Sequence, residues 1–143
     1  MAHIVPDASF LCHALVRTQR TAEAQTKYLE AIMNPDIRWT TSAAVYLGFG
    51  SGLRKLGERG TLGRDEELEL FATLNDLPAD RYGISARLTQ RAWEIAHRLR
   101  QTDVFDSFGL AVAEEVDAVL WTSDLRFFNA AAPFAPDRIE YVP

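Results

Sequence analysis

Three aspartates occupy positions from which their oxygens could converge on one edge of a sheet. Asp7 follows the apolar run Ile4-Val5-Pro6, and Asp124 comes shortly after the apolar run Ala118 to Trp121. Asp106 opens a helical stretch. Ligands of open α/β sheets bind at the carboxyl ends of the strands, and Mg²⁺ and Mn²⁺ prefer oxygen ligands. The spacing therefore predicts an acidic pocket that holds Mg²⁺ or Mn²⁺.

An ion in such a pocket has a defined chemistry. It lowers the pKa of a bound water, which attacks a phosphodiester in line, and it stabilises charge on the leaving oxygen. His3, His13 and His97 are widely spaced and form no metal-ligand pattern, so no histidine base is indicated. Each aspartate could instead cap a helix, which is a common use of this residue. Capping is the simpler explanation of any single one, whereas the shared edge favours a metal site.

The elements that must position these aspartates alternate between strand and helix along the chain. Strands are expected at residues 3–7, 37–40, 80–84, 118–121 and 139–142. Helices are expected at about 9–17, 21–33, 43–57, 64–74, 85–100 and 106–115, with another opened by Asp124. This order predicts one α/β domain over residues 1–143, with helices on both faces of a short, mainly parallel sheet.

Several apolar side chains are assigned to the core. On the helix at 64–74 these are Leu68, Leu70, Phe71 and Leu74. Trp39, Trp93 and Trp121 are assigned to the core rather than to surfaces on which nucleic-acid bases stack. The single cysteine, Cys12, excludes an internal disulfide and is expected to be a buried apolar residue rather than a nucleophile.

The composition limits the classes of function. The formal net charge of −5 argues against a non-specific nucleic-acid coat protein. The sequence contains no run of about 18 apolar residues, so no membrane span is predicted. No secretory signal is evident either, and a cytoplasmic protein is expected. The segment Gly48-Phe49-Gly50-Ser51-Gly52 lacks the spacing of a dinucleotide or phosphate loop. Three glycines in a helix instead need a packing or functional reason, because each costs about 1 kcal/mol relative to alanine.

The order of the aspartate motifs resembles the PIN-domain ribonucleases, and within them the VapC-like toxins of VapBC-type toxin–antitoxin pairs. The segments that carry the resemblance span nearly the whole chain: Asp7-Ala8-Ser9, Val104-Phe105-Asp106-Ser107 and Leu120-Trp121-Thr122-Ser123-Asp124. It implies a three-layer PIN-like fold and a Mg²⁺- or Mn²⁺-dependent endoribonuclease. It also implies a homodimer that is neutralised by a cognate antitoxin protein.

Carried over by position, the resemblance implies roles for five residues. Asp7, Asp106 and Asp124 would be the catalytic, metal-binding carboxylates, and Ser9 and Thr122 would orient them. RNA phosphates would be contacted by arginines on elements that begin near these carboxylates, for which the candidates are Arg17, Arg54 and Arg126.

The chain departs from the family at one carboxylate. The family carries a glutamate shortly before a segment that here reads Leu53-Arg54-Lys55, and Gly48 occupies that place. The departure leaves two interpretations open: a nuclease, weakened or inactive as it stands, or a non-catalytic module that binds RNA or a protein. A phosphatase-like hydrolase ranks below both, because Ser9 stands where its second aspartate is needed.

Overall fold

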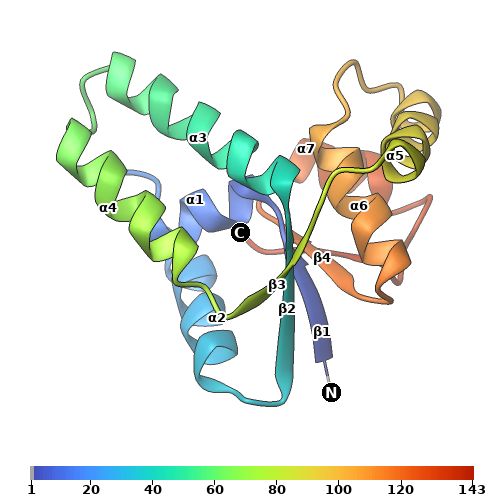
Figure 1. The fold of residues 1–143 in the computed structure, drawn as a ribbon, viewed down its shortest axis with the longest axis horizontal. Helices are drawn as coiled ribbons and strands as arrows, with labels where there is room; N and C mark the ends of the chain where they lie inside the picture. Colours follow the sequence, from blue (N-terminus) through green and yellow to red (C-terminus); the bar gives the residue numbers. More distant parts are fainter. Residues whose placement is uncertain (1) are drawn as a thin grey trace.

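The computed structural model describes residues 2–143, which form five strands and seven helices (Figure 1). The strands are β1 Ala2–Pro6, β2 Ile37–Ser42, β3 Ala79–Tyr82, β4 Val119–Thr122 and β5 Ile139–Tyr141. The helices are α1 Ala8–Leu15, α2 Ala22–Met33, α3 Ala43–Glu58, α4 Arg64–Asn75, α5 Ala86–Leu99, α6 Phe105–Glu115 and α7 Leu125–Ala131. Each element that the sequence predicts is present, and its ends lie within two residues of the expected ones.

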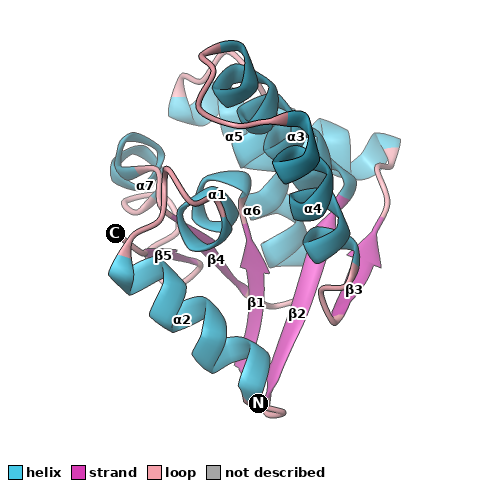
Figure 2. Cartoon of the chain, turned by 90° about the vertical axis from the view of Figure 1, so that its left-hand side faces the viewer, coloured by secondary structure: helices cyan, strands magenta, loops and turns pink. Residues whose placement is uncertain are grey.

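The strands form one sheet in the order β3-β2-β1-β4-β5, and every pairing is parallel (Figure 2). From β1 the chain adds β2 and β3 on one side, and then crosses to add β4 and β5 on the other. The strand order therefore reverses between β1 and β4, where Pro6 is in register with Trp121. Such a switch point is where open α/β sheets bind their ligands.

Helices cover both faces of the sheet, as predicted. Successive side chains of a strand point to opposite faces, so Ile4 packs with α1 to α4 whereas Val5 packs with α5 to α7. Trp39 and Trp121 belong to the first cluster and Leu120 to the second. Figure 1 shows the two groups of helices on the left and right of the sheet. The chain is thus a three-layer α/β domain.

The expected inward face of α4 is only partly correct. Leu74 is buried, but Leu68 is 54% exposed and Phe71 is 37% exposed. The reason is that α4 packs on the outside of α3 rather than on the sheet, so Phe71 meets Phe49 edge to face at a centroid distance of 6.2 Å. A helix in this outer position buries a narrower stripe than its apolar residues suggest.

The assignment of Trp93 to the core is wrong, whereas Trp39 and Trp121 are buried. Trp93 is 59% exposed, because the buried stripe of α5 consists of Leu88, Ala92, Ile95 and Ala96. None of the helices within residues 2–143 is long and apolar enough to cross a bilayer.

Close packing of α3 explains the three glycines at positions 48, 50 and 52. A Cβ added at Gly48 would lie 3.0 Å from the Cβ of Ala8, and one at Gly52 would lie 3.4 Å from the Sγ of Cys12, both on α1. On its other side, a Cβ at Gly50 would lie 3.4 Å from the ring of Phe71. The glycine segment is therefore a helix that other helices approach closely, and not a phosphate loop. Burial also raises the pKa of the Cys12 thiol to about 12, which leaves it unreactive.

Candidate carboxylate site

Asp7 lies at the switch point, directly after β1. Its backbone N–H donates to the carbonyl of Trp121 over 3.0 Å and so ties it to β4. One carboxylate oxygen, Oδ1, accepts the N–H of Phe10 at 2.8 Å and the hydroxyl of Ser9 at 2.7 Å. Asp7 therefore caps α1, as the simpler interpretation held, but capping occupies only Oδ1.

Asp124 lies at the same edge, two residues past the end of β4. Its side chain caps α7 by accepting the N–H of Phe127 at 3.0 Å. Thr122 accepts the backbone N–H of Asp124 at 3.1 Å, and Ser9 accepts the N–H of Ser123 at 3.0 Å. Since Ser9 also donates to Asp7, a short hydrogen-bonded chain fixes the Asp7 end of the site relative to the Asp124 end.

Asp106 caps no helix. Asp106 is the second residue of α6. Val104, which precedes the helix, makes no capping hydrogen bond with its side chain, and the N–H of Phe105 donates instead to the side chain of Asp103 at 3.2 Å. Asp106 and Asp124 line one hollow of about 270 Å³ together with Asp103. The structure therefore brings Asp106 to the edge already occupied by Asp7 and Asp124.

Burial, with neighbouring negative charge, raises the pKa of two of these aspartates. Burial raises the pKa of Asp106 to about 7, and the charges of Asp7, Asp124 and Asp103 contribute in that order. Burial likewise raises the pKa of Asp7 to about 6, against the lowering effect of the hydrogen bonds from Ser9 and Phe10 and of the nearby Thr122 hydroxyl. Acidic groups that share a confined site resist being charged together, and a cation would relieve that repulsion.

A metal ion fits one further feature of these residues. Asp7 is only 3% exposed, yet its Oδ2 is buried without a hydrogen-bond partner, a costly state for a carboxylate oxygen. Within residues 2–143, no three His, Cys, Asp or Glu side chains stand close enough to hold an ion between them. Mg²⁺ needs no such cage, because it keeps several waters and takes one or two carboxylates. The donors present thus fit a hydrated, hard cation.

Position 48 adjoins the site, and a side chain there would require its neighbour to shift. Gly48 contacts Ala8, the residue after Asp7, so the place of the family's glutamate lies beside the first turn of α1. A Cβ there would come within 3.0 Å of another Cβ, which is tighter than ordinary van der Waals contact. The chain thus has a glycine in place of the family's glutamate, and α1 and α3 pack closely at that position.

Of the three arginines expected near the carboxylates, only Arg126 lines their hollow. Arg17 follows the far end of α1 and pairs with Glu66 at 3.3 Å. Sequence reasoning missed Arg100 and Asp103, which line the hollow from the α5–α6 connection. The only signal for Asp103 was its place three residues before Asp106.

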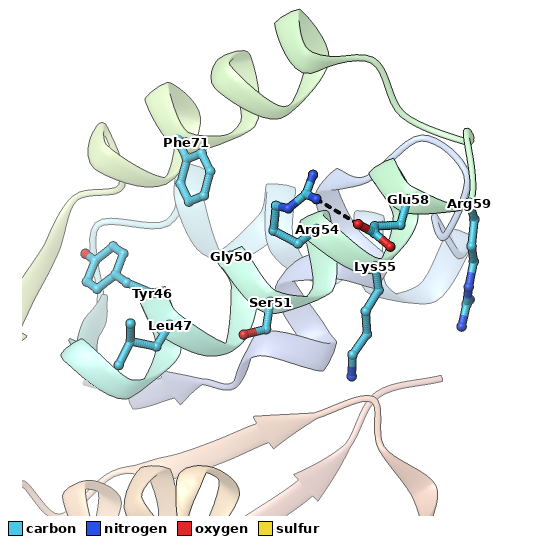
Figure 3. Close-up of a pocket in the computed structure, with 9 residues that line it drawn as sticks. All are labelled: Tyr46, Leu47, Gly50, Ser51, Arg54, Lys55, Glu58, Arg59 and Phe71. Atoms are coloured by element: carbon cyan, nitrogen blue, oxygen red, sulfur yellow. Dashed lines mark hydrogen bonds and ion pairs between the residues drawn. The ribbon is translucent and has the colours of Figure 1, made fainter.

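Arg54 lies in a different and larger hollow of about 990 Å³ between α3 and α4 (Figure 3). It pairs there with Glu58 at 3.1 Å. The lining combines apolar and basic side chains: Phe71 extends from α4 toward α3, whereas Lys55 extends from α3 away from α4. This hollow has no carboxylate group comparable to that at the switch point.

Comparison with known proteins points to one family. The model of the PIN domain matches residues 4–133. Ribonuclease VapC9 of Mycobacterium tuberculosis is 33% identical over 86 residues, which are 60% of this chain and 65% of that protein. The VapC ribonuclease Mb0985 of Mycobacterium bovis matches to the same extent. The chain thus spans slightly less than two thirds of the length of these relatives.

Solved structures support the same fold. VapBC2 of Rickettsia felis, bound to a promoter DNA fragment, has a TM-score of 0.69 at 13% identity, with 99% of each chain covered. VapC20 of Mycobacterium tuberculosis, described as a toxin that cleaves the sarcin-ricin loop, has a TM-score of 0.65 at 21% identity, covering 98% of this chain and 99% of the other. At these identities the likeness concerns the fold alone.

Proposed function

Since the chain belongs to the PIN-domain family, we propose that it is a divalent-metal-dependent endoribonuclease and the toxin of a VapBC-type toxin–antitoxin pair. The observation that carries the proposal is the buried carboxylate of Asp7, whose Oδ2 has no partner at the switch point, beside Asp106 and Asp124. The ribonuclease names of the 33%-identical relatives support the reaction class.

In this proposal Asp7, Asp106 and Asp124 hold a hydrated Mg²⁺ or Mn²⁺, with one or two of them as direct ligands and the rest through bound water. A bound ion of this kind supplies an activated water and stabilises charge on a phosphoryl group. Ser9 and Phe10 fix Oδ1 of Asp7 and thereby leave Oδ2 for the ion, while Thr122 holds the start of the Asp124 turn. Because the pKa values of Asp7 and Asp106 are raised to about 6 and about 7, ion binding below neutral pH displaces protons.

The partners follow from the same proposal. RNA would enter over Arg126, and Arg17 and Arg54 are retained as more remote phosphate contacts. A cognate antitoxin is supported by the toxin–antitoxin complexes among the similar structures and by the apolar side chains of Leu47 and Phe71 at the larger hollow. The proposal also includes a homodimer and a cytoplasmic location, where cellular RNA is available.

A cleavage assay tests the reaction. The protein is incubated with a mixed RNA pool and Mg²⁺ or Mn²⁺, with EDTA and Asp7→Asn as matched controls. We expect metal-dependent internal cleavage that EDTA and Asp7→Asn both abolish. Cleavage that survives Asp7→Asn would show a contaminating nuclease and would contradict the assigned site.

One observation favours a second function, a PIN-domain module that binds RNA or a protein without cleaving it. Gly48 leaves the site with one carboxylate fewer than the family pattern, and a side chain at that position would press on Ala8. Binding of the RNA pool with no cleavage under any of the tested metals would select this alternative.

A further inference from the structure

Trp93 presents an indole ring on the solvent side of α5. It follows the buried Ala92 directly, and one residue along a helix turns the side chain by about 100°. The ring is 59% exposed and stacks on His97, with a centroid distance of 5.5 Å and an interplanar angle of 16°. This near-parallel stack supports one face of the ring. Trp93 is the only large exposed apolar side chain on α5.

Two arginines beside the carboxylate hollow have no carboxylate partner. Arg87 and Arg91, on the same helix as Trp93, pair with Glu115 and Glu114 at 2.7 and 2.8 Å. Arg100 and Arg126 line a hollow with three aspartates, yet neither forms an ion pair within residues 2–143. Their guanidinium groups are therefore available to an anion that approaches the hollow.

The stacked ring and the hollow are joined by the last two turns of α5. The helix ends at Leu99, and Arg100 adopts a left-handed conformation, with φ 57°, that turns the chain into the lining of the hollow. Seven residues separate Trp93 from Arg100, which is about 10 Å of helix. Stacked nucleotides follow one another at about 3.4 Å, so the ring lies about three nucleotides from the hollow.

We propose that Trp93 and His97 form a platform on which an unpaired base of RNA stacks, while Arg100 and Arg126 contact the phosphates that lead into the carboxylate hollow. The inference rests on the proposed function and specifies its substrate as single-stranded or looped RNA. Unpaired bases stack on aromatic side chains irrespective of sequence, whereas duplex RNA shields its bases.

The surroundings of Trp93 favour RNA over a second copy of the chain. The neighbouring exposed residues of α5 are polar: Thr89, Gln90 and Glu94. A stable protein interface buries about 800 Å² on each partner around an apolar centre. A single exposed ring in a polar helix face does not supply such a centre, but it suffices for one base.

Binding is tested without cleavage, in EDTA, with a short fluorescein-labelled single-stranded RNA of mixed sequence. Trp93→Leu should weaken binding by about 5-fold to about 150-fold, the effect of removing one base stack. Trp93→Phe should retain most of the affinity. Met33→Ala removes an exposed apolar side chain from α2 and should have no effect. The same RNA annealed to its complement should compete poorly.

Salt dependence separates the stacking contact from the phosphate contact. Arg100→Gln should reduce the slope of log affinity against log salt by about 0.7, the value for one phosphate of a single strand. Trp93→Leu should leave the slope unchanged, because stacking releases no counterions. Arg64→Gln, on the distant start of α4, makes the same charge change and should have less effect on the slope than Arg100→Gln.

The outcomes distinguish this inference from the proposed function. Equal RNA affinity of the wild-type protein and Trp93→Leu would overturn the platform while leaving the nuclease intact. A Trp93→Leu protein that loses a dimer in light scattering and keeps its RNA affinity would assign the face to a second copy. Wild-type protein that neither binds nor cleaves single-stranded RNA would overturn the proposed function itself.

Discussion

Gly48→Glu is the most informative substitution, because it restores the family's carboxylate at a position where α1 and α3 are tightly packed. The new Cβ would lie 3.0 Å from the Cβ of Ala8. Both atoms are attached directly to helix backbones, so relief requires α1 and α3 to move apart by several tenths of an ångström. The variant therefore combines a steric cost with an electrostatic gain at the metal site.

The two contributions to stability can be compared. Replacing a helical glycine favours folding by up to about 1 kcal/mol, whereas overpacking a tight contact costs about 1–3 kcal/mol. We expect the steric cost to exceed the gain; with the full gain realised, the net loss is up to about 2 kcal/mol. At this chain length, 1 kcal/mol corresponds to a change in Tm of about 2–5 °C. Ala8→Gly removes the opposing Cβ and should recover most of the loss in the double variant.

Thermal unfolding with and without Mn²⁺ measures both effects. Gly48→Gln is the matched control, since it has the same size without the charge. We expect both variants to lose stability in EDTA, and Gly48→Glu combined with Ala8→Gly to be stabilised more by Mn²⁺ than its glutamine counterpart. Additive effects of Gly48→Glu and Ala8→Gly would show that the α1–α3 contact is not close. Equal Mn²⁺ stabilisation of the glutamate and glutamine variants would show that position 48 does not face the ion.

Three further predictions concern the carboxylates. Folding raises the pKa of Asp7 from 3.8 to about 6 and that of Asp106 to about 7, so between about pH 4 and pH 7 the folded protein binds more protons than the unfolded chain. The Tm of the metal-free protein should therefore decrease as the pH is raised from about 4 to about 7. An increase in Tm over this range would contradict the assignment. Asp106→Asn should raise the free energy of unfolding of the metal-free protein at pH 8 by up to about 4 kcal/mol, because burial and the neighbouring aspartates disfavour the charge that the variant removes. It should also weaken stabilisation by Mn²⁺, and a loss of stability would instead identify Asp106 as structural. Ser9→Ala should lower the free energy of unfolding, measured in urea, by about 1–3 kcal/mol, because the N–H of Ser123 and Oδ1 of Asp7 each lose a partner. Unchanged stability would mean that water replaces the hydroxyl.

Most of the fold was predictable from local patterns. The apolar run ending at Trp121 predicted a strand of the parallel sheet, and β1 ends at Pro6, which cannot donate to a ladder, one residue before the expected end. The positions of Asp7 and Asp124 at strand ends placed them on one edge, because all strands run parallel. Such conclusions depend only on periodicity and strand direction.

Other features depend on contacts between distant segments, which a single sequence does not reveal. Trp93 belongs to an amphipathic helix, but the rotation of α5 on α6 leaves its ring in solvent. Phe71 is exposed because α4 packs on α3 rather than on the sheet. Arg100 reaches the hollow only through the left-handed turn that ends α5. Each outcome is set by how whole elements dock.

The glycines of α3 connect the fold to the chemistry of the site. Gly48 and Gly52 let α3 approach Ala8 and Cys12, and this contact determines where α1 lies. Asp7 caps α1 through Oδ1, so the position of α1 in turn fixes the direction of Oδ2. A glutamate at position 48 would displace the helix that holds Asp7. The absence of a carboxylate at position 48 is therefore linked to the close packing of α1 on α3. A nuclease built on this chain must act through Asp7, Asp106 and Asp124 alone, or the space between α1 and α3 must first widen.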